Sequence, residues 1–366
     1  MHIPDGYLSP STCVVLYGAS APFWYAALRR VKKLFHTRLV PLISVFAAFS
    51  FVIMMFNLPI PGGTTAHAVG VGIAAVVLGP WASMLAVSIA IFIQALFFGD
   101  GGVTTFGANS FNMAIVGSVV AYLVYRALAG RASLTSSRRV LAAAFAGYVA
   151  INASALCAAV ELGLQPHFFK DSTGAPLYAP YPLSIAIPAM MIAHLTFAGL
   201  AELVVSGGVV AYLQRAEPSL LRFTAPGAPT AFGGDEPIPR DARRGGWSTA
   251  KSLWIATALL MLLTPLGILA GGAAWGEWSA RDFSNPAARA KIAMVSRNAA
   301  PPAQAPRGLS RLSSLWAAPF PNYAPRFVRR AGFGYILSAM FGAGVIILLF
   351  LMLGWFAGRK NANLLS

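Results

Sequence analysis

Charged residues are scarce in this chain. Only 10% of its 366 residues are charged, whereas 57% are hydrophobic and the mean hydropathy is +0.67. A soluble domain carries roughly 25% charged residues, so this composition cannot cover a globular surface with polar groups and excludes a soluble protein. Long apolar runs satisfy their backbone groups in a bilayer by forming helices. We therefore predict an all-α integral membrane protein.

Acidic residues and cysteines are also few. The chain has 11 acidic against 27 basic residues, which gives a net charge of +16. In a soluble protein this charge would indicate nucleic acid, but here the basic residues lie mostly between apolar runs, where they orient a chain in the bilayer. We expect the lipid bilayer and no nucleic acid as a partner. Cys13 and Cys157 lie in apolar runs and form neither a metal motif nor a disulfide framework.

Apolar runs of the length of a spanning helix, about 20 residues, are the main feature that is present. We predict nine spans, near 9–28, 39–57, 66–79, 82–98, 109–128, 140–163, 182–213, 252–272 and 333–357. The third is short, and Gly79-Pro80 separates it from the fourth. The seventh is long and contains Pro188, which we expect to bend it. The prediction is a seven-helix body plus two further transmembrane helices.

Basic clusters indicate the orientation of these spans. With alternating spans, the clusters after the first span, around the fifth and sixth, between the seventh and eighth, and at the end of the chain fall on one side. By the positive-inside rule that side is the cytoplasm, which predicts a multi-pass protein of the cell (inner) membrane with its amino terminus outside. The segment 273–331 disagrees, because it should lie outside and yet carries nine basic residues.

The composition also divides the chain into parts. Residues 1–222 hold the seven-span body, and residues 251–366 form a two-span module around an outer loop. Between them, residues 223–250 are rich in Pro, Gly and charge, which predicts a flexible cytoplasmic linker. The outer loop contains "NAAPPAQAPRG", which is too rich in Pro and Ala to pack a core of its own.

Histidine is infrequent, and one of the five histidines directly follows Met1. The Met1 amine has a pKa of about 8 and loses its proton readily to a competing metal. The backbone amide and imidazole of His2 add two more nitrogen atoms, so that fused chelate rings can form in one plane. Nickel(II) and copper(II) can displace an amide proton and accept planar nitrogen ligands, and cobalt is also plausible.

A fourth nitrogen atom would complete this plane. His67, in "PGGTTAHAVGVG", lies on the same predicted side of the membrane as the amino terminus and is our preferred ligand; the alternative is a structural histidine at a helix end. We expect His36 in a basic cytoplasmic loop, His167 in an exposed outer loop and His194 in the middle of a span.

A glycine-rich turn, "GDGG", is predicted on the same outer side. Four polar residues flank or belong to it: Gln94, Asp100, Asn109 and Asn112. Asn109 and Asn112 are three residues apart and share a helix face. They could support a metal-bound segment by hydrogen bonds, or they could only join helices within the membrane.

The motifs "MHIPDG", "AHAVG", "GPWA", "QALFFGDGG" and "FGANSFNMA" together resemble the nickel/cobalt substrate-capture component of energy-coupling-factor transporters, a membrane component associated with cobalamin biosynthesis. This resemblance covers most of residues 1–215. It implies a seven-helix capture subunit that binds the metal through the Met1 amine, the His2 amide and imidazole, and His67. It also implies partners, namely ATP-binding subunits and a transmembrane coupling subunit. The tail resembles the small two-span companion subunit of these systems.

The metal is then the transported substrate, and no cofactor is expected. The "MHIPDG" and "FGDGG" motifs and the four planar nitrogen atoms favour Ni²⁺ over Co²⁺. We expect no enzyme activity in this chain. "GGWSTAKS" imitates a phosphate loop but lacks its second glycine and a preceding strand.

Two rival interpretations differ in class. An intramembrane metalloenzyme would use His194, Glu202 and Glu161, but no HExxH pair is present. His194 and Glu202 could instead form a proton relay or an interface with a membrane partner. A stand-alone channel or exporter would need a polar pathway across the bilayer, for which the intramembrane polar residues are too few.

Overall fold

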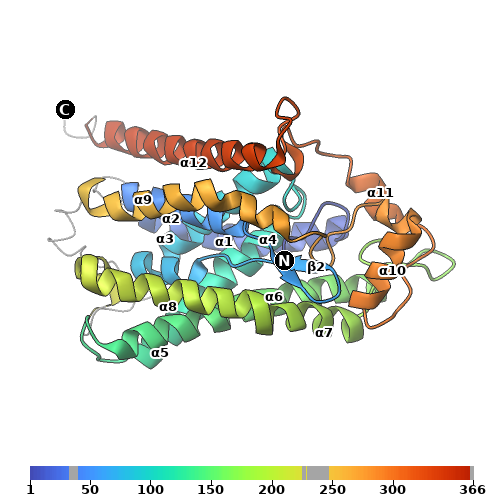
Figure 1. Cartoon of the computed structure of the whole chain (residues 1–366), viewed down its shortest axis with the longest axis horizontal. Helices are drawn as coiled ribbons and strands as arrows, with labels where there is room; N and C mark the ends of the chain where they lie inside the picture. The colour runs from blue at the N-terminus through green and yellow to red at the C-terminus, as the bar shows by residue number, and fades with distance from the viewer. Residues whose placement is uncertain (33–39, 225–227, 229–246, 363–366) are drawn as a thin grey trace.

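The computed structural model describes residues 1–32, 40–224, 228 and 247–362. His36 and most of the predicted 223–250 linker lie outside these residues. The described chain is mainly helical, and its long helices run side by side along the longest axis of the molecule (Figure 1). The amino terminus lies at one end of this bundle, beside β2 and toward α10 and α11. These features agree with the predicted all-α membrane protein.

Most predicted spans coincide with helices of the body. The first and second correspond to α1 (Pro10–Lys32) and α2 (Val40–Met54). The fifth comprises α4 (Phe106–Asn109), the π-helical turn η2 (Ser110–Val116) and α5 (Gly117–Ala129), and the sixth is α6 (Ser137–Phe168). The seventh comprises α7 (Leu183–Ala193), the π-helical turn η3 (His194–Ala198) and α8 (Gly199–Ala216), with η4 (Pro218–Thr224) after it.

Six helical stretches of the described chain are long and apolar enough to cross a membrane: Val71–Phe98, Phe106–Ala129, Ser137–Phe168, Leu183–Ala216, Lys251–Leu269 and Ala331–Trp355. α2 is apolar but has only 15 residues. α6 packs against α5, α7 and α8, whereas α2 packs against α3 and the two helices of the tail. Together with their composition, this packing makes the chain a multi-pass membrane protein.

The helix α3 (Val71–Ile93), continued by the π-helical turn η1 (Gln94–Phe98), is folded back on itself at Gly79. An added Cβ at Gly70 would lie 2.7 Å from the ring of Phe49. Gln94 reaches the same part of α2, because its Nε2 lies 3.5 Å from the Phe51 carbonyl oxygen. A straight helix would hold Gly70 and Gln94 about 36 Å apart, so the chain must reverse between them.

The reversal occurs at the end of the bundle opposite the amino terminus. Gly79 has φ 74° and ψ 169°, a conformation that only glycine adopts readily, and Pro80 follows it. Close by, the Arg30 guanidinium at the end of α1 lies 4.5 Å above the ring of Trp81, and the Thr224 hydroxyl donates to the Val76 carbonyl at 3.3 Å. The predicted break at Gly79-Pro80 is therefore confirmed.

The third predicted span is shorter than expected. Its helical limb, 71–78, has a length of about 12 Å and cannot cross a hydrocarbon core of about 30 Å. The predicted range 66–79 was wrong at its start, because residue 66 ends β2 and residues 67–70 are not helical. β1 (Leu58–Ile60) and β2 (Thr64–Ala66) form an antiparallel hairpin in which Ile60 pairs with Thr64. This hairpin delivers His67 to the end of the bundle where the chain begins.

The tail contributes two long helices and a folded segment between them. The helices are α9 (Trp247–Leu263), continued by η6 (Thr264–Leu269), and α12 (Ala331–Ala362). The segment between them contains η7 (Asp282–Ser284), α10 (Pro286–Val295), α11 (Arg307–Leu312) and η8 (Pro321–Tyr323). It does not build a separate core: Trp275, Trp278 and Phe283 are buried within one core that is continuous with the body.

We expect Gly79→Ala to destabilise the protein by about 1–3 kcal/mol, because an alanine Cβ disfavours this backbone conformation although no atom lies within 4 Å of it. Thermal unfolding in detergent measures the effect. Gly18→Ala is the matched control: Gly18 lies in α1 with no atom within 4 Å of its Cβ position, and alanine should be neutral or stabilising there. Equal stability of the two variants would contradict a strained reversal.

Candidate metal-binding site at the amino terminus

The first residues of the chain enter the body as an extended segment. The exposed fractions of Met1, His2 and Ile3 are 2%, 3% and 0%. Terminal residues usually fray unless contacts hold them. Here the Tyr7 hydroxyl donates to the Trp278 carbonyl at 2.7 Å, and the Ser9 amide donates to Gln165 Oε1 at 2.9 Å. The segment is therefore part of the core.

Ile3 is held on both of its backbone groups. Its amide donates to Asn109 Oδ1 at 2.8 Å, and Asn109 Nδ2 donates back to the Ile3 carbonyl at 3.1 Å. The Gly102 amide and the Thr105 hydroxyl also donate to that carbonyl. Two residues further on, Asp5 accepts hydrogen bonds from the amides of residues 103 and 104. Asn109 thus binds the terminal segment on both sides of Ile3; its support of a metal-bound segment stays a prediction.

The imidazoles of His2 and His67 lie against each other. Their ring centroids are 5.0 Å apart and the planes are inclined by 24°. His67 Nδ1 lies 3.0 Å from the Ala68 carbonyl oxygen, which leaves Nε2 as the nitrogen with a free lone pair. The Nε2 atoms of both rings are buried without a hydrogen-bond partner among the described residues. A buried imidazole nitrogen with a free lone pair, such as His67 Nε2, is a suitable ligand for a cation.

Asp100 orients His2 from the other side. Its Oδ1 lies 2.8 Å from His2 Nδ1, and its Oδ2 accepts a hydrogen bond of 2.6 Å from the Tyr323 hydroxyl. Gln94 Nε2 donates to that hydroxyl at 2.9 Å. Burial acts to raise the pKa of Asp100, but His2 opposes it and lowers the pKa below its usual value. Asp100 thus contacts His2 directly, and Gln94 is linked to Asp100 through the Tyr323 hydroxyl.

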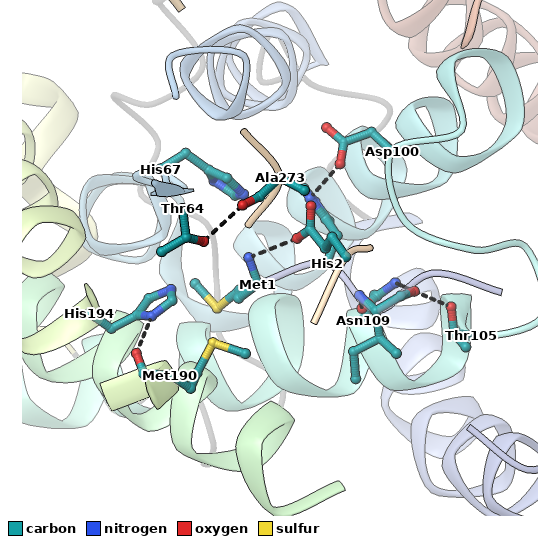
Figure 2. Close-up of polar contacts among 12 residues, drawn as sticks. Met1, His2, Thr64, His67, Asp100, Thr105, Asn109, Met190, His194 and Ala273 are labelled. Atoms are coloured by element: carbon teal, nitrogen blue, oxygen red, sulfur yellow. Dashed lines mark hydrogen bonds and ion pairs between the residues drawn. The ribbon is translucent and has the colours of Figure 1, made fainter. Parts of the chain in front are cut away.

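The Met1 amine faces a carboxylate of the tail. Its nitrogen lies 3.4 Å from Glu277 Oε1, and both side chains are largely enclosed. Burial raises the pKa of Glu277, although the charged amine acts against this. Figure 2 shows Met1 between the His2–His67 pair and His194, whose Nδ1 lies 2.8 Å from the Met190 carbonyl oxygen. Nitrogen atoms and two carboxylates thus surround the start of the chain.

Sequence analysis missed Glu277 and Tyr323. Both lie in the segment 273–331, for which the sequence analysis predicted a loop without a core of its own and no residue of the site. The aromatic residues Trp275, Trp278 and Phe283 were the signal that could have shown otherwise, because three large apolar side chains in so short a stretch indicate burial. The structure joins this segment to the body through a bridge between Ala274 and Thr65 of β2.

Other candidate residues lie elsewhere. Asn112 makes a different contact: its Nδ2 donates to Glu161 Oε2 at 2.8 Å, and no described hydrogen bond joins it to residues 1–3. His167 is exposed, as expected. The suggested His194–Glu202 relay is not formed among the described contacts: Glu202 accepts hydrogen bonds from the amides of Val69, Gly70 and Gly72.

Side chains alone do not define a metal site in the described part of the chain. No group of three or more His, Cys, Asp or Glu side chains there is arranged to hold a metal ion. The nitrogen cluster at the amino terminus differs, because it includes two main-chain atoms, the Met1 amine and the His2 amide. The residues named for a metalloenzyme, His194, Glu202 and Glu161, each have separate partners.

This architecture defines a multi-pass membrane protein in which buried imidazole and amine nitrogen atoms are concentrated around the first residues of the chain. Residues 2–220 match the CbiM family, described as the cobalt uptake substrate-specific transmembrane region. The chain therefore belongs to the CbiM family and is a metal-transport protein of the membrane, extended by a second part.

Its relatives include proteins of the same length. The fused nickel transport protein NikMN of Rhodobacter capsulatus is 54% identical over 348 residues, 95% of each chain. The probable fused nickel transport protein LarMN of Lactiplantibacillus plantarum is 41% identical over 357 residues, 97% of each chain. The cobalt transport protein CbiM of Geobacter sulfurreducens is 35% identical over 225 residues, 60% of this chain and 61% of the relative.

Solved structures agree with the fold of the body. A crystal structure titled as a truncated transition metal transporter is 54% identical, with a TM-score of 0.55, and covers 58% of this chain and 98% of its own. A second, titled as a transition metal transporter, is 52% identical with a TM-score of 0.56 and covers 61% and 98%.

We expect His67 to make metal-free stability depend on pH. Burial, the charged amine and His2 lower the pKa of His67 well below its usual value. Below about pH 6.5 the unfolded chain binds a proton that the folded protein does not, so stability falls with decreasing pH by up to about 1.4 kcal/mol per pH unit. Above that pH this contribution is constant.

Unfolding in detergent, compared between wild type and His67→Gln, measures this slope. The two curves should run parallel above about pH 6.5 and diverge below it, with wild type losing stability faster. Curves that stay parallel across the whole range would show that His67 is not held neutral by its surroundings.

Proposed function

We propose that this chain is the substrate-binding membrane component of an ATP-driven energy-coupling-factor importer for Ni²⁺, or for Co²⁺. The observation that carries the proposal is the burial of the Met1 amine beside two stacked imidazoles whose Nε2 atoms have no partner. The ion would be captured at the outer face by the Met1 amine, the His2 amide, the His2 imidazole and His67. Asp100, Asn109 and Gln94 would hold these groups in place.

The chemistry of the chelate assigns the atoms. His2 can close a ring with its own amide nitrogen only through Nδ1, the atom that faces Asp100 in this structure. We infer that the imidazole turns about its Cβ–Cγ bond when the ion binds, which releases Nδ1 from Asp100 for the ion. His67 would use Nε2, because its Nδ1 already faces the Ala68 carbonyl. A metal-bound histidine usually donates its other N–H to such an acceptor.

Nickel is the better fit among the two ions. Four nitrogen atoms that include a deprotonated amide favour nickel(II) in a planar arrangement. Two relatives aligned over nearly their whole length are named as nickel transport proteins. A relative that aligns with the body alone is named as a cobalt transport protein, and cobalt supply for cobalamin synthesis is the alternative.

The energy source would lie in partner subunits. The sequence "GGWSTAKS" is not a phosphate loop, because its last six residues, 247–252, are the start of the helix α9 and do not form a loop after a strand. ATP-binding subunits and a transmembrane coupling subunit would complete the importer. In this arrangement residues 1–222 are the capture domain, 223–250 the cytoplasmic linker and 251–366 the two-span module. The amino terminus would lie outside the cell (inner) membrane, opposite the reversal at Gly79.

One residue added before Met1 should abolish nickel binding, because it converts the amine into an amide and adds bulk where Met1 is 2% exposed. Calorimetry with purified protein, whose terminus is verified by intact mass, compares the two forms for nickel and cobalt. Tighter binding of nickel by the native terminus would support the assignment. Equal binding by the extended protein would place the metal elsewhere.

We expect His67→Ala to lower nickel affinity more than tenfold, because loss of a protein ligand leaves a planar ion with three nitrogen atoms. His167→Ala is the control, since this exposed histidine lies outside the cluster. Binding titrations of both variants measure the difference. Similar losses in the two variants would remove the reason for assigning His67 as a ligand.

A further inference from the structure

A buried carboxylate on α8 holds the backbone that follows His67. Glu202 has an exposed fraction of 0%. Its Oε2 accepts hydrogen bonds from the amides of Val69 and Gly70, both at 2.8 Å, and its Oε1 accepts one from the Gly72 amide at 3.0 Å. The Ser206 hydroxyl donates to Oε1 at 3.5 Å. Three of these four groups are backbone N–H groups that can only donate, which matches an ionised carboxylate.

These bonds satisfy the start of the first limb of α3. The first N–H groups of any helix have no partner within the helix, and leaving them unpaired in a membrane is costly. A negative charge at this position also interacts favourably with the helix dipole. Gly70, with φ 75°, turns the chain from the extended segment into the limb and allows neighbouring amides to converge on one carboxylate.

The same segment determines where His67 points. His67 Nδ1 lies 3.0 Å from the carbonyl of Ala68, the residue directly before the segment that Glu202 holds. That segment is tightly packed against α6 and α8. An added Cβ at Gly72 would lie 2.6 Å from Gly147 Cα and would collide with the Ser206 hydroxyl. A shift at 69–72 therefore moves the carbonyl that orients the His67 ring.

We propose that Glu202 is a positioning residue for metal capture: through the amides of residues 69–72 it holds His67 Nε2 in register with Met1 and His2. Glu202 itself does not touch the ion. This inference rests on the proposed function only in that His67 must be a metal ligand. A movement of α8 would therefore change the position of the His67 side chain through residues 69–72.

Glu202→Gln tests the role. The glutamine side chain keeps one oxygen atom and places an NH₂ group at the position of the other. At least one backbone N–H then loses the oxygen atom that accepts its hydrogen bond. The matched control is Glu161→Gln, which also alters a carboxylate on a spanning helix. Glu161 is partly buried and bonded to Asn112, and no described hydrogen bond joins it to residues 67–72. Nickel affinity, the visible absorption of bound nickel and thermal unfolding are measured for each purified protein.

We expect Glu202→Gln to bind nickel at least tenfold more weakly, as is common when a residue that orients a metal ligand is changed. Its nickel absorption should differ from wild type, because the fourth nitrogen is displaced. Glu161→Gln should stay within about twofold of wild-type affinity and keep the wild-type spectrum. This should hold even if its unfolding temperature falls as much as that of Glu202→Gln. Glu202→Asp, which keeps the charge but shortens the reach, should recover part of the affinity.

Three results would overturn the proposal. The first is wild-type affinity and spectrum in folded Glu202→Gln. The second is an equal loss in Glu161→Gln. The third is failure of both Glu202 variants to fold while Glu161→Gln folds, which would assign the carboxylate to folding alone. Failure of the proposed function is distinct, because wild type itself would then bind nickel no better than protein extended before Met1.

Discussion

The hydrogen bonds that hold Ile3 are the interaction on which the rest of the site depends. An extended chain that enters a helical membrane protein cannot pair its backbone groups within itself, and lipid offers no partners. Asn109, Gly102 and Thr105 supply the partners for both groups of Ile3. Because the amide and the carbonyl of Ile3 are both held, the two preceding residues are directed into the cluster with His67.

Opposite charges meet in this cluster. The ammonium of Met1 lies near Glu277, and His2 lies near Asp100. The side chains of Glu277 and Asp100 are only 21% and 20% exposed, and a charge that is largely removed from water needs a partner of opposite sign. Both carboxylates would also lie close to a divalent cation captured there as proposed above.

The tail and the body share this site. Glu277 and Tyr323 come from the segment between α9 and α12, yet they contact Met1 and Asp100 of the body. The phenol of Tyr323 connects Asp100 to Gln94, the first residue of η1, through two hydrogen bonds. Burial and the nearby Asp100 raise the pKa of Tyr323, which keeps the phenol as a donor.

The sequence by itself determined the class of the protein, the positions of the long helices and the break at Gly79-Pro80. These features follow from local properties: apolar length, the rarity of charge, and the backbone freedom of one glycine before a proline. The pattern also singled out Met1, His2, His67, Asp100, Asn109 and Gln94, because nitrogen ligands behind an amino terminus and polar residues around a glycine turn are unusual in an apolar chain.

Only the tertiary structure decided which of the remaining polar residues meet. Asn112 pairs with Glu161, and Glu202 caps the segment after His67 instead of pairing with His194. Glu277 reaches Met1 across 276 positions of the chain. Sequence periodicity indicates which face of a helix a residue occupies, but not which other helix that face meets. In this protein the packing of α8 on α3, and of the segment between α9 and α12 on the amino terminus, determines which of these residues meet.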